Sequence, residues 1–253
     1  NTGITHNNNI NFSRAGENFN ARVSYTNLDV KGLIPNSYLR RNTLATNASV
    51  DLSSKFSIGA NFTYVAQRQQ AENNDAYSNS STGSFNQWFH RNLDMDIMRE
   101  LSDLRSPGNN LASWNHANPN NFNPGAPENF YKGNYWYNPF SYFNNIENLF
   151  DRNRLFGDVN FNFRANENLR FRAAVRKNYV NTNTENKKFY IIETSATQTG
   201  ERAAYGTRQT IFDDTRYELT GNYNRKIQDF SLDLLGGAEL VKISSRDLSA
   251  STR

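Results

Sequence analysis

The feature that most constrains this chain is a strict alternation of apolar and polar side chains in residues 32–65. After a tight turn, apolar residues fill every second position, and small or polar residues fill the positions between them. The apolar set is Phe56, Ile58, Ala60, Phe62 and Tyr64, and the polar set is Ser57, Gly59, Asn61 and Thr63. Because successive side chains of a strand point to opposite faces, this stretch is predicted to be a β-hairpin with one apolar face and one wet face.

The same alternation returns in further segments and predicts about eight strands in all. These segments are residues 7–14, 19–27, 155–163, 169–176, 215–223 and 230–240. The connections between the predicted strands alternate between short and long along the chain. An antiparallel up-and-down barrel whose short turns share one rim has this topology, whereas a β-sandwich shows no such regularity.

Hydropathy excludes a helical membrane protein and leaves a membrane barrel open. Only 36% of the 253 residues are hydrophobic and the mean hydropathy is −0.82. No apolar run approaches the roughly 18 residues that a membrane helix requires. A transmembrane strand turns only alternate residues toward lipid, and its lumen side and loops are polar. The expected fold class is therefore all-β, as part of a large transmembrane antiparallel up-and-down β-barrel.

The sequence contains no pattern typical of an enzyme, a metal site or a nucleic-acid-binding protein. It has no cysteine, and His6, His90 and His116 lie too far apart for a metal-ligand motif. Asp213 and Asp214 are adjacent in a predicted strand, so their side chains point to opposite faces and cannot flank one glycosidic bond. The net charge of +4 comes without a long basic run, which argues against nucleic acid as a partner. We expect no enzymatic activity, no cofactor and no metal.

A diffuse pattern around the first hairpin carries a family resemblance. It combines a glycine with an apolar neighbour, a serine before an aromatic residue, an arginine pair, an Asn-Thr-Leu strand and the sequence FSIGANFTYV after a short turn. The positions are Gly32, Leu33, Ser37, Tyr38, Arg40, Arg41, Asn42, Leu44, Asn47, Ile58, Gly59, Asn61 and Tyr64. This pattern resembles the SusC/RagA family of TonB-dependent outer-membrane transporters, and weaker similarity runs over most of the chain.

The resemblance implies a function, a location and partners. It implies energised import of oligosaccharides or oligopeptides across the bacterial outer membrane. A SusD-like lipoprotein would cover the extracellular side, and the TonB complex would act through upstream regions that are not in this chain. The chain starts at Asn1 without a leader, so we interpret it as an internal barrel segment.

The chain divides into three expected parts. Residues 1–70 are predicted to form about four barrel strands, and residues 151–253 about four more, with a second long loop near residues 181–207. Between them, residues 71–150 are predicted to form a long extracellular loop, because outer-membrane barrels carry their long loops on that side. Apolar residues at three- and four-residue spacing predict a helix near residues 84–103 of this loop. The short apolar piece at residues 189–192 is predicted to extend neighbouring strands.

Two groups of side chains are candidate sites. Trp114, Trp136 and Tyr137 lie in an aromatic part of the long loop and are candidate contacts for a ligand or a lid protein; burial in a loop core is the alternative. Arg170, Arg172 and Arg176 share the polar face of one predicted strand. They are a candidate lumen patch for carboxylates of a plug or an acidic substrate; ordinary lumen polarity is the alternative.

The alternation also assigns residues to lipid and to lumen. The predicted lipid-facing residues are Phe19, Val23, Ile58, Phe62, Phe161, Phe171, Leu219 and Leu232. The predicted lumen-facing residues are Arg22, Asn61, Asn160, Arg172 and Asp233. The inward-facing arginines have few expected acidic partners and would crowd a narrow eight-stranded core. The first and last strands are therefore expected to pair with strands outside residues 1–253.

Two rival functions belong to other classes. The first is a soluble secreted all-β binding module or adhesin that uses the aromatic, asparagine-rich loop. The second is a secreted β-rich hydrolase, which would need an inward cluster of carboxylates. Dependence on detergent distinguishes a membrane barrel from the soluble module.

Overall fold

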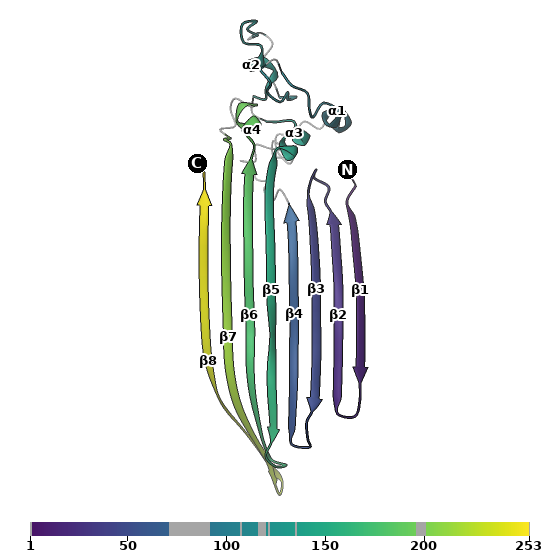
Figure 1. The fold of residues 1–253 in the computed structure, drawn as a ribbon, viewed down its shortest axis with the longest axis vertical. Helices are drawn as coiled ribbons and strands as arrows, with labels where there is room; N and C mark the ends of the chain where they lie inside the picture. Colours follow the sequence, from purple (N-terminus) through teal and green to yellow (C-terminus); the bar gives the residue numbers. More distant parts are fainter. Residues whose placement is uncertain are drawn as a thin grey trace.

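The chain forms a single layer of eight antiparallel strands with a cap of loops and short helices at one end (Figure 1). The computed structural model describes residues 2–70, 92–106, 108–115, 120, 122–134, 136–195 and 201–252. The strands lie in sequence order, and each is hydrogen-bonded to its neighbour in the chain. The predicted all-β up-and-down topology is therefore confirmed.

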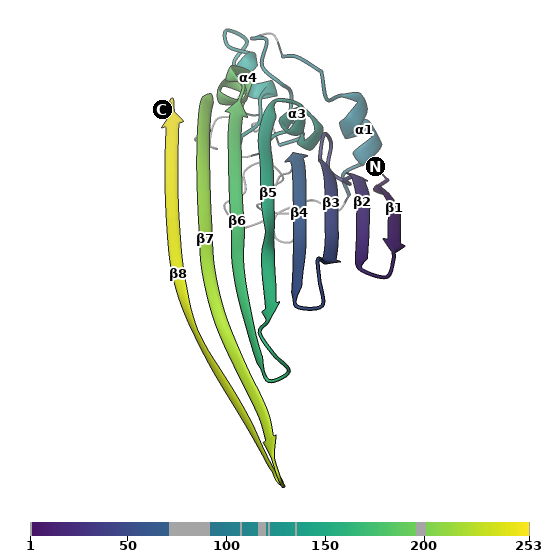
Figure 2. The ribbon, with the colours of Figure 1, turned by 60° about the horizontal axis from the view of Figure 1, so that its bottom comes forward.

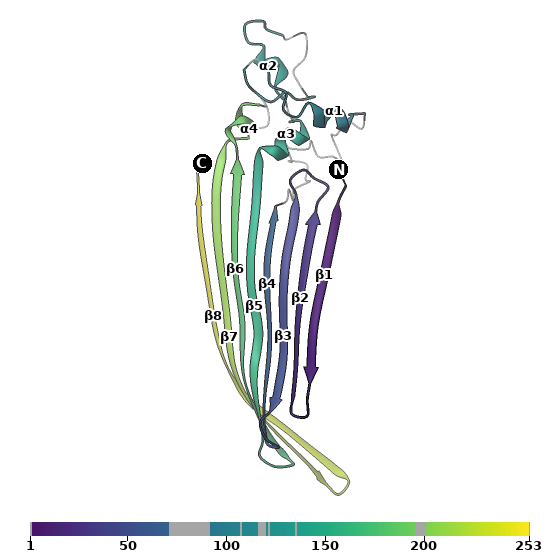
Figure 3. The same cartoon turned by 45° about the vertical axis from the view of Figure 1, so that its right-hand side comes forward.

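The strands grow longer toward the C-terminus, from 12 residues in β1 to 24 in β7. They are β1 (Ile4–Ala15), β2 (Phe19–Lys31), β3 (Tyr38–Asp51), β4 (Phe56–Gln70), β5 (Ile146–Arg164), β6 (Leu169–Lys188), β7 (Ala204–Ile227) and β8 (Phe230–Ser251). In Figures 2 and 3 the β7–β8 hairpin extends past the other strands at the end opposite the helices. The four short turns lie at that end, as the alternation of connections predicted.

In the described residues, four short helices belong to the long connections. They are α1 (Met95–Glu100), α2 (Glu128–Tyr131), α3 (Pro139–Asn144) and α4 (Tyr190–Thr194). In the described part of the chain, no helix has the length and apolar character needed to cross a bilayer. Of the helix predicted near residues 84–103, residues 95–100 form α1, which begins after the N-cap Asp94 and ends at the C-cap Leu101. Residues 84–91 of that prediction lie outside the described residues.

Cross-strand register separates the side chains into two faces. All eight residues predicted to face lipid share one face of the sheet, and all five predicted to face the lumen share the other. We call the first the outer face and the second the inner face. Large apolar side chains stand exposed on the outer face, including Phe12 at 68%, Leu219 at 56% and Leu240 at 67%. The alternation is weaker in β8, where Leu235, Val241 and Ile243 also point to the inner face.

Tyrosines mark the loop-side edge of the apolar band. The hydroxyl of Tyr25 donates to Oδ1 of Asn42 at 2.8 Å, and that of Tyr64 donates to Oδ1 of Asn153 at 3.0 Å. In both pairs the ring lies level with apolar neighbours, and the hydroxyl reaches an asparagine one step closer to the loops. An aromatic ring with a satisfied polar tip suits the boundary between hydrocarbon and water.

The sheet is open at both edges. Within the described residues β1 pairs only with β2 and β8 only with β7, so these strands do not close a ring. Both chain ends lie at the end of the sheet that carries the helices (Figure 1). The expectation that this chain does not form a complete barrel alone is therefore confirmed, and β1 and β8 each present one unpaired edge.

Two predictions about the second long connection are wrong. Strand β6 continues to Lys188 and β7 already starts at Ala204, so the connection is shorter than residues 181–207. These strand extensions carry polar residues on both faces, and the apolar alternation is absent there. Residues 189–192 do not extend a strand: Phe189 caps α4, and Ile192 is fully buried in the loops.

We predict that arginine is tolerated at position 61 and not at position 62. In the full-length protein, Phe62→Arg places a cation in the apolar outer band and should lower the free energy of unfolding by about 2 to 4 kcal/mol. Asn61→Arg is the matched control, because its side chain lies on the inner face within reach of Asp158. Urea unfolding of both variants in lipid vesicles measures the difference. Equal destabilisation would contradict the two-face assignment.

Candidate functional site

A small hydrophobic core holds the long connections together above the sheet. Its buried members come from the β4–β5 and β6–β7 connections and from the first residue of β5. They are Leu111, Tyr137, Tyr142, Phe143, Ile146 and Ile192, with Ile34 and Ile191 packed against them. We call this the loop core. The sheet is one layer thick, so the largest fully buried apolar side chains of the described residues lie here.

Hydrogen bonds between segments far apart in sequence fix the loop core. The hydroxyl of Tyr137 donates to the carbonyl oxygen of Ile192 at 2.8 Å. The amide of Leu111 donates to Oγ of Ser195 at 2.8 Å, and the amide of Gly133 donates to the carbonyl oxygen of Ser195 at 2.7 Å. These bonds attach the loop between β4 and β5 to the loop between β6 and β7.

The shorter connection between β2 and β3 joins the same unit. The side-chain amide of Asn36 donates to the carbonyl oxygen of Phe143 at 3.2 Å and to Oδ1 of Asn144 at 3.0 Å. Asn138 caps α3 and donates to the carbonyl oxygen of Met98 at 2.8 Å, which ties α3 to α1. The described parts of all three connections on this side are therefore linked to one another over the end of the sheet.

The predicted aromatic contacts have different environments. Tyr137 is 1% exposed, so the prediction that it contacts a ligand or lid is wrong. Its ring fills the loop core and its hydroxyl is used within it. Trp114 and Trp136 are half-buried, and their rings stack with centroids 5.9 Å apart. Their role as ligand or lid contacts stays a prediction.

The inner face carries a network of ion pairs around the predicted arginine patch. Glu218 lies opposite Ala174, between two arginines of β6. It is 3.0 Å from Arg176 and 3.7 Å from Arg172, and Arg172 is also 3.8 Å from Asp158. On β7, Arg216 pairs with Asp214 and with Glu239 of β8. The expectation of few acidic partners is therefore wrong for these arginines.

Arg170 differs from the other two members of the patch. It lies directly opposite Arg164 in the β5–β6 register. Neither guanidinium forms an ion pair within the described part of the chain. Both line a hollow of about 910 Å³ at the short-turn end, together with Lys55 and Arg172. Asp51 is the one carboxylate among the residues that line it. Like charges directly opposite one another destabilise a sheet, so this hollow favours an anion.

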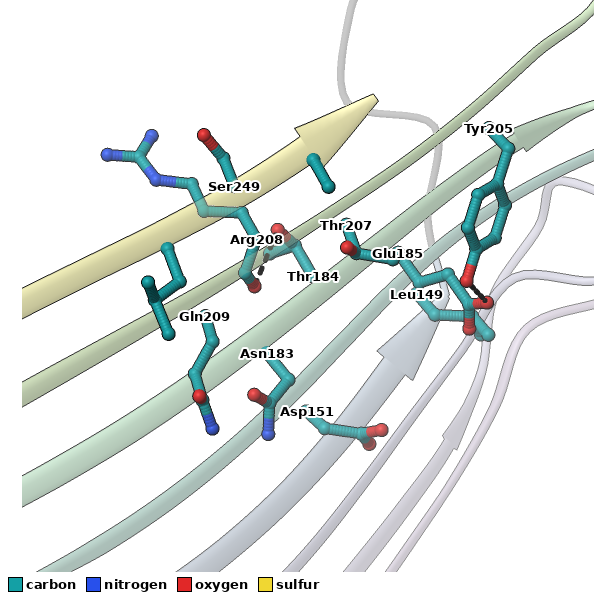
Figure 4. Close-up of a pocket in the computed structure, with 12 residues that line it drawn as sticks. Leu149, Asp151, Asn183, Thr184, Glu185, Tyr205, Thr207, Arg208, Gln209 and Ser249 are labelled. Carbon is teal, nitrogen blue, oxygen red and sulfur yellow. Dashed lines mark hydrogen bonds between the residues drawn. The ribbon is translucent and has the colours of Figure 1, made fainter. Parts of the chain in front are cut away.

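A second hollow lies on the outer face near the loop end of β5–β8 (Figure 4). In it the hydroxyl of Tyr205 donates to Glu185 at 3.0 Å, and Lys187 lies 3.2 Å from Glu185. Hydrogen bonds from Lys187 and then Tyr205 lower the pKa of Glu185 below its ordinary value. A carboxyl group whose pKa is lower in the folded than in the unfolded protein stabilises the fold at pH values above its unfolded-state pKa. This stabilisation is lost as the pH falls through the folded-state pKa. Glu185 is therefore charged at neutral pH.

No metal site is assembled in the described residues. They contain no group of three histidine, cysteine, aspartate or glutamate side chains that could hold an ion. His6 lies on β1, and His90 and His116 fall outside the described residues.

No protein-family model matches the chain, and no curated protein does. Solved structures do match. The RagAB peptide importer in its closed-closed state matches with a TM-score of 0.67 and 13% identity, over 98% of this chain and 25% of that chain. Its open-open state matches with a TM-score of 0.66 and 15% identity, over the same shares of the two chains.

The ferric-catecholate import receptor Fiu from E. coli K12 also matches. Its TM-score is 0.56 at 9% identity, over 96% of this chain and 33% of that chain. The chain thus spans a quarter to a third of the length of these proteins. The likeness shows that this sheet has the fold of part of a TonB-dependent transporter barrel.

We predict that the loop core orders the long connections without being needed for the sheet. In the full-length protein, Ile192→Ala removes a fully buried side chain and should destabilise the loop unit by about 2 to 5 kcal/mol. Limited proteolysis should then cut residues 92–145 faster. Tyr190→Ala in the same helix is the control, because Tyr190 is 69% exposed. Equal protection of both variants would contradict the role of the loop core.

Proposed function

We propose that this chain forms part of the barrel wall of a TonB-dependent transporter in the bacterial outer membrane. The observation that carries the proposal is the exposed apolar outer face, set against a charged inner face in one open sheet. Lipid would cover the first face, and a water-filled lumen with its plug would meet the second. Strands from outside this chain would complete the wall at β1 and β8, because open sheet edges do not occur in lipid.

The outer face argues against the soluble binding module. A soluble protein rarely leaves a contiguous apolar patch larger than a few hundred square ångströms in water. Here the apolar band crosses all eight strands, and tyrosines with bonded hydroxyls mark its edge. The secreted hydrolase would need an inward cluster of free carboxylates. Three neighbouring inner carboxylates, Asp158, Asp214 and Glu218, are each paired with an arginine instead.

The proposed cargo is an oligopeptide or an oligosaccharide. The similarity to the RagAB peptide importer supports a peptide, since its name states that cargo. A SusD-like lipoprotein would cover the loop surface from outside the cell, where the stacked Trp114 and Trp136 are candidate contacts. The TonB complex would act through parts of the protein outside this chain. No enzymatic step and no cofactor belong to this proposal.

The inner-face arginines have separate proposed tasks. Arg172 and Arg176 share Glu218 and would stiffen the wall. Arg170 and Arg164 would bind a carboxylate presented inside the lumen, from the plug or from an acidic cargo. Two guanidinium groups side by side provide the forked donors that carboxylates prefer.

The proposed transport is tested by uptake of fluorescent oligopeptides into cells with and without the full-length protein. We expect uptake to require the protein and to stop when the proton gradient is collapsed. The protein should fractionate with outer membranes and migrate differently on a denaturing gel before and after heating. Recovery in the soluble fraction without detergent would contradict the proposal.

The arginine pair is tested by Arg164→Gln/Arg170→Gln, with Arg22→Gln as the control on the same face. If the pair holds the plug, cells with the double variant should become sensitive to a large antibiotic that intact outer membranes exclude. If it receives cargo, uptake of acidic peptides should fall about tenfold while neutral peptides enter normally. A double variant that matches Arg22→Gln in both assays would contradict a carboxylate site.

A further inference from the structure

The outer-face hollow near the loop end of β5–β8 has no role in the transport proposed above. It encloses about 510 Å³. Its outer-face lining residues are polar and planar for the most part, and Figure 4 shows them on neighbouring strands. They are Asp151, Asn183, Glu185, Tyr205, Thr207 and Gln209, beside the apolar Leu149, Leu248 and Ala250. We call this the outer hollow.

The pairing of β6 with β7 places the outer hollow on the face opposite the proposed lumen, so a transported molecule does not reach it. Asn183 of β6 and Gln209 of β7 lie opposite one another, on the same face as Val175 and Leu219 of the apolar band. A molecule that passes through the lumen meets the other face of the sheet. The ligand of the outer hollow must therefore approach from the membrane side of the barrel wall.

The height of the outer hollow limits which membrane component can reach it. On β6 the edge of the apolar band is Tyr179, which pairs with Leu155 of β5. At about 3.3 Å per residue and a tilt of about 40°, Asn183 lies roughly 10 Å beyond Tyr179, and Tyr205, which pairs with Lys187, lies roughly 20 Å beyond it. By the same estimate Leu149 lies roughly 15 Å beyond Leu155 on β5. Phospholipid headgroups extend only about 5 to 8 Å past the hydrocarbon on each side. A lipid that reaches the outer hollow must carry a large headgroup.

The charges of the outer hollow are already compensated, which disfavours phosphate. Asp151 lies 3.5 Å from Arg68, and Glu185 lies 3.2 Å from Lys187. Lys187 also reaches Glu147 at 3.1 Å. No excess of cations is left on these residues to attract an anion, so the surface is suited to a neutral polar group.

The side chains of the outer hollow are those that recognise sugars. The ring of Tyr205 is 44% exposed and is held by the bond from its hydroxyl to Glu185. Carboxylate and amide oxygens accept bonds from sugar hydroxyls, and an amide NH₂ donates to them. The side-chain amide of Asn183 forms no hydrogen bond within the described part of the chain. An apolar ring beside fixed polar groups can pack against the C–H face of a sugar while the polar groups bind its hydroxyls.

We propose that the outer hollow binds the saccharide headgroup of a glycolipid in the outer leaflet. This inference rests on the proposed function, because that function places the outer face in a membrane. The glycolipid chains would lie against the apolar band, and its sugars would lie along β5–β8 up to Tyr205. The bound lipid would anchor the barrel wall beside the loop core.

The test uses full-length protein purified in detergent and fluorescent lipopolysaccharide from the host cells. The wild type should bind this probe, and unlabelled delipidated core oligosaccharide should displace it. Vesicles of phosphatidylglycerol should not displace it. Tyr205→Ala/Asn183→Ala should weaken binding about tenfold. Thr182→Ala is the control, because Thr182 precedes Asn183 and points to the inner face.

Three results would overturn the inference. The first is equal binding by the double variant and the control. The second is displacement by phosphatidylglycerol as effective as that by the core oligosaccharide, which would mean attraction by charge alone. The third is an altered oligomeric state of the double variant with unchanged binding of lipopolysaccharide. That result would mean that a second copy of the protein occupies the outer hollow. Peptide uptake should be unchanged in the double variant. A wild-type protein that imports no peptide would therefore contradict the proposed transport and not the glycolipid site.

Discussion

The structure depends on one constraint: every backbone hydrogen bond of the eight strands must be made within a single layer. Within the described residues no second layer covers the sheet, so its apolar face needs a cover from outside these residues. Because apolar and polar side chains alternate along the strands, one face of the sheet is apolar and the other is polar. The outer face carries residues such as Phe62 and Leu219, and the inner face carries paired charges such as Arg176 and Glu218. A membrane barrel wall satisfies both faces at once.

The same constraint explains why the long connections fold into their own unit. A one-layer wall offers the loops no apolar surface at its rim, so they bury side chains against one another. Tyr137, Ile192 and Ser195 link connections that are far apart in sequence. Strands β5 to β8 rise past the apolar band to meet this unit, and their outer faces become polar. The outer hollow lies on this extension, between the apolar band and the loop core.

The sequence predicts the wall better than it predicts the loops or the charge network. Period-two alternation and turn residues are local signals, and they predicted which residues share each face. The extensions of β6 and β7 were missed because polar residues occupy both of their faces, so the sequence shows no apolar alternation there. Burial of Tyr137 was missed because its partner Ile192 is distant in sequence. The acidic partners of Arg172 lie on other strands, although aligning the predicted hairpins would have placed Glu218 beside it.

The central claim is that alternate residues of one strand meet lipid and water. This part of the protein contains no cysteine, so single cysteines can be introduced at each position from 56 to 64 of the full-length protein and spin-labelled in lipid vesicles. We expect spin labels at even positions to be relaxed by oxygen dissolved in the bilayer. Spin labels at odd positions should be relaxed by a water-soluble nickel complex. Accessibility without a period of two, or the reverse parity, would contradict the claim.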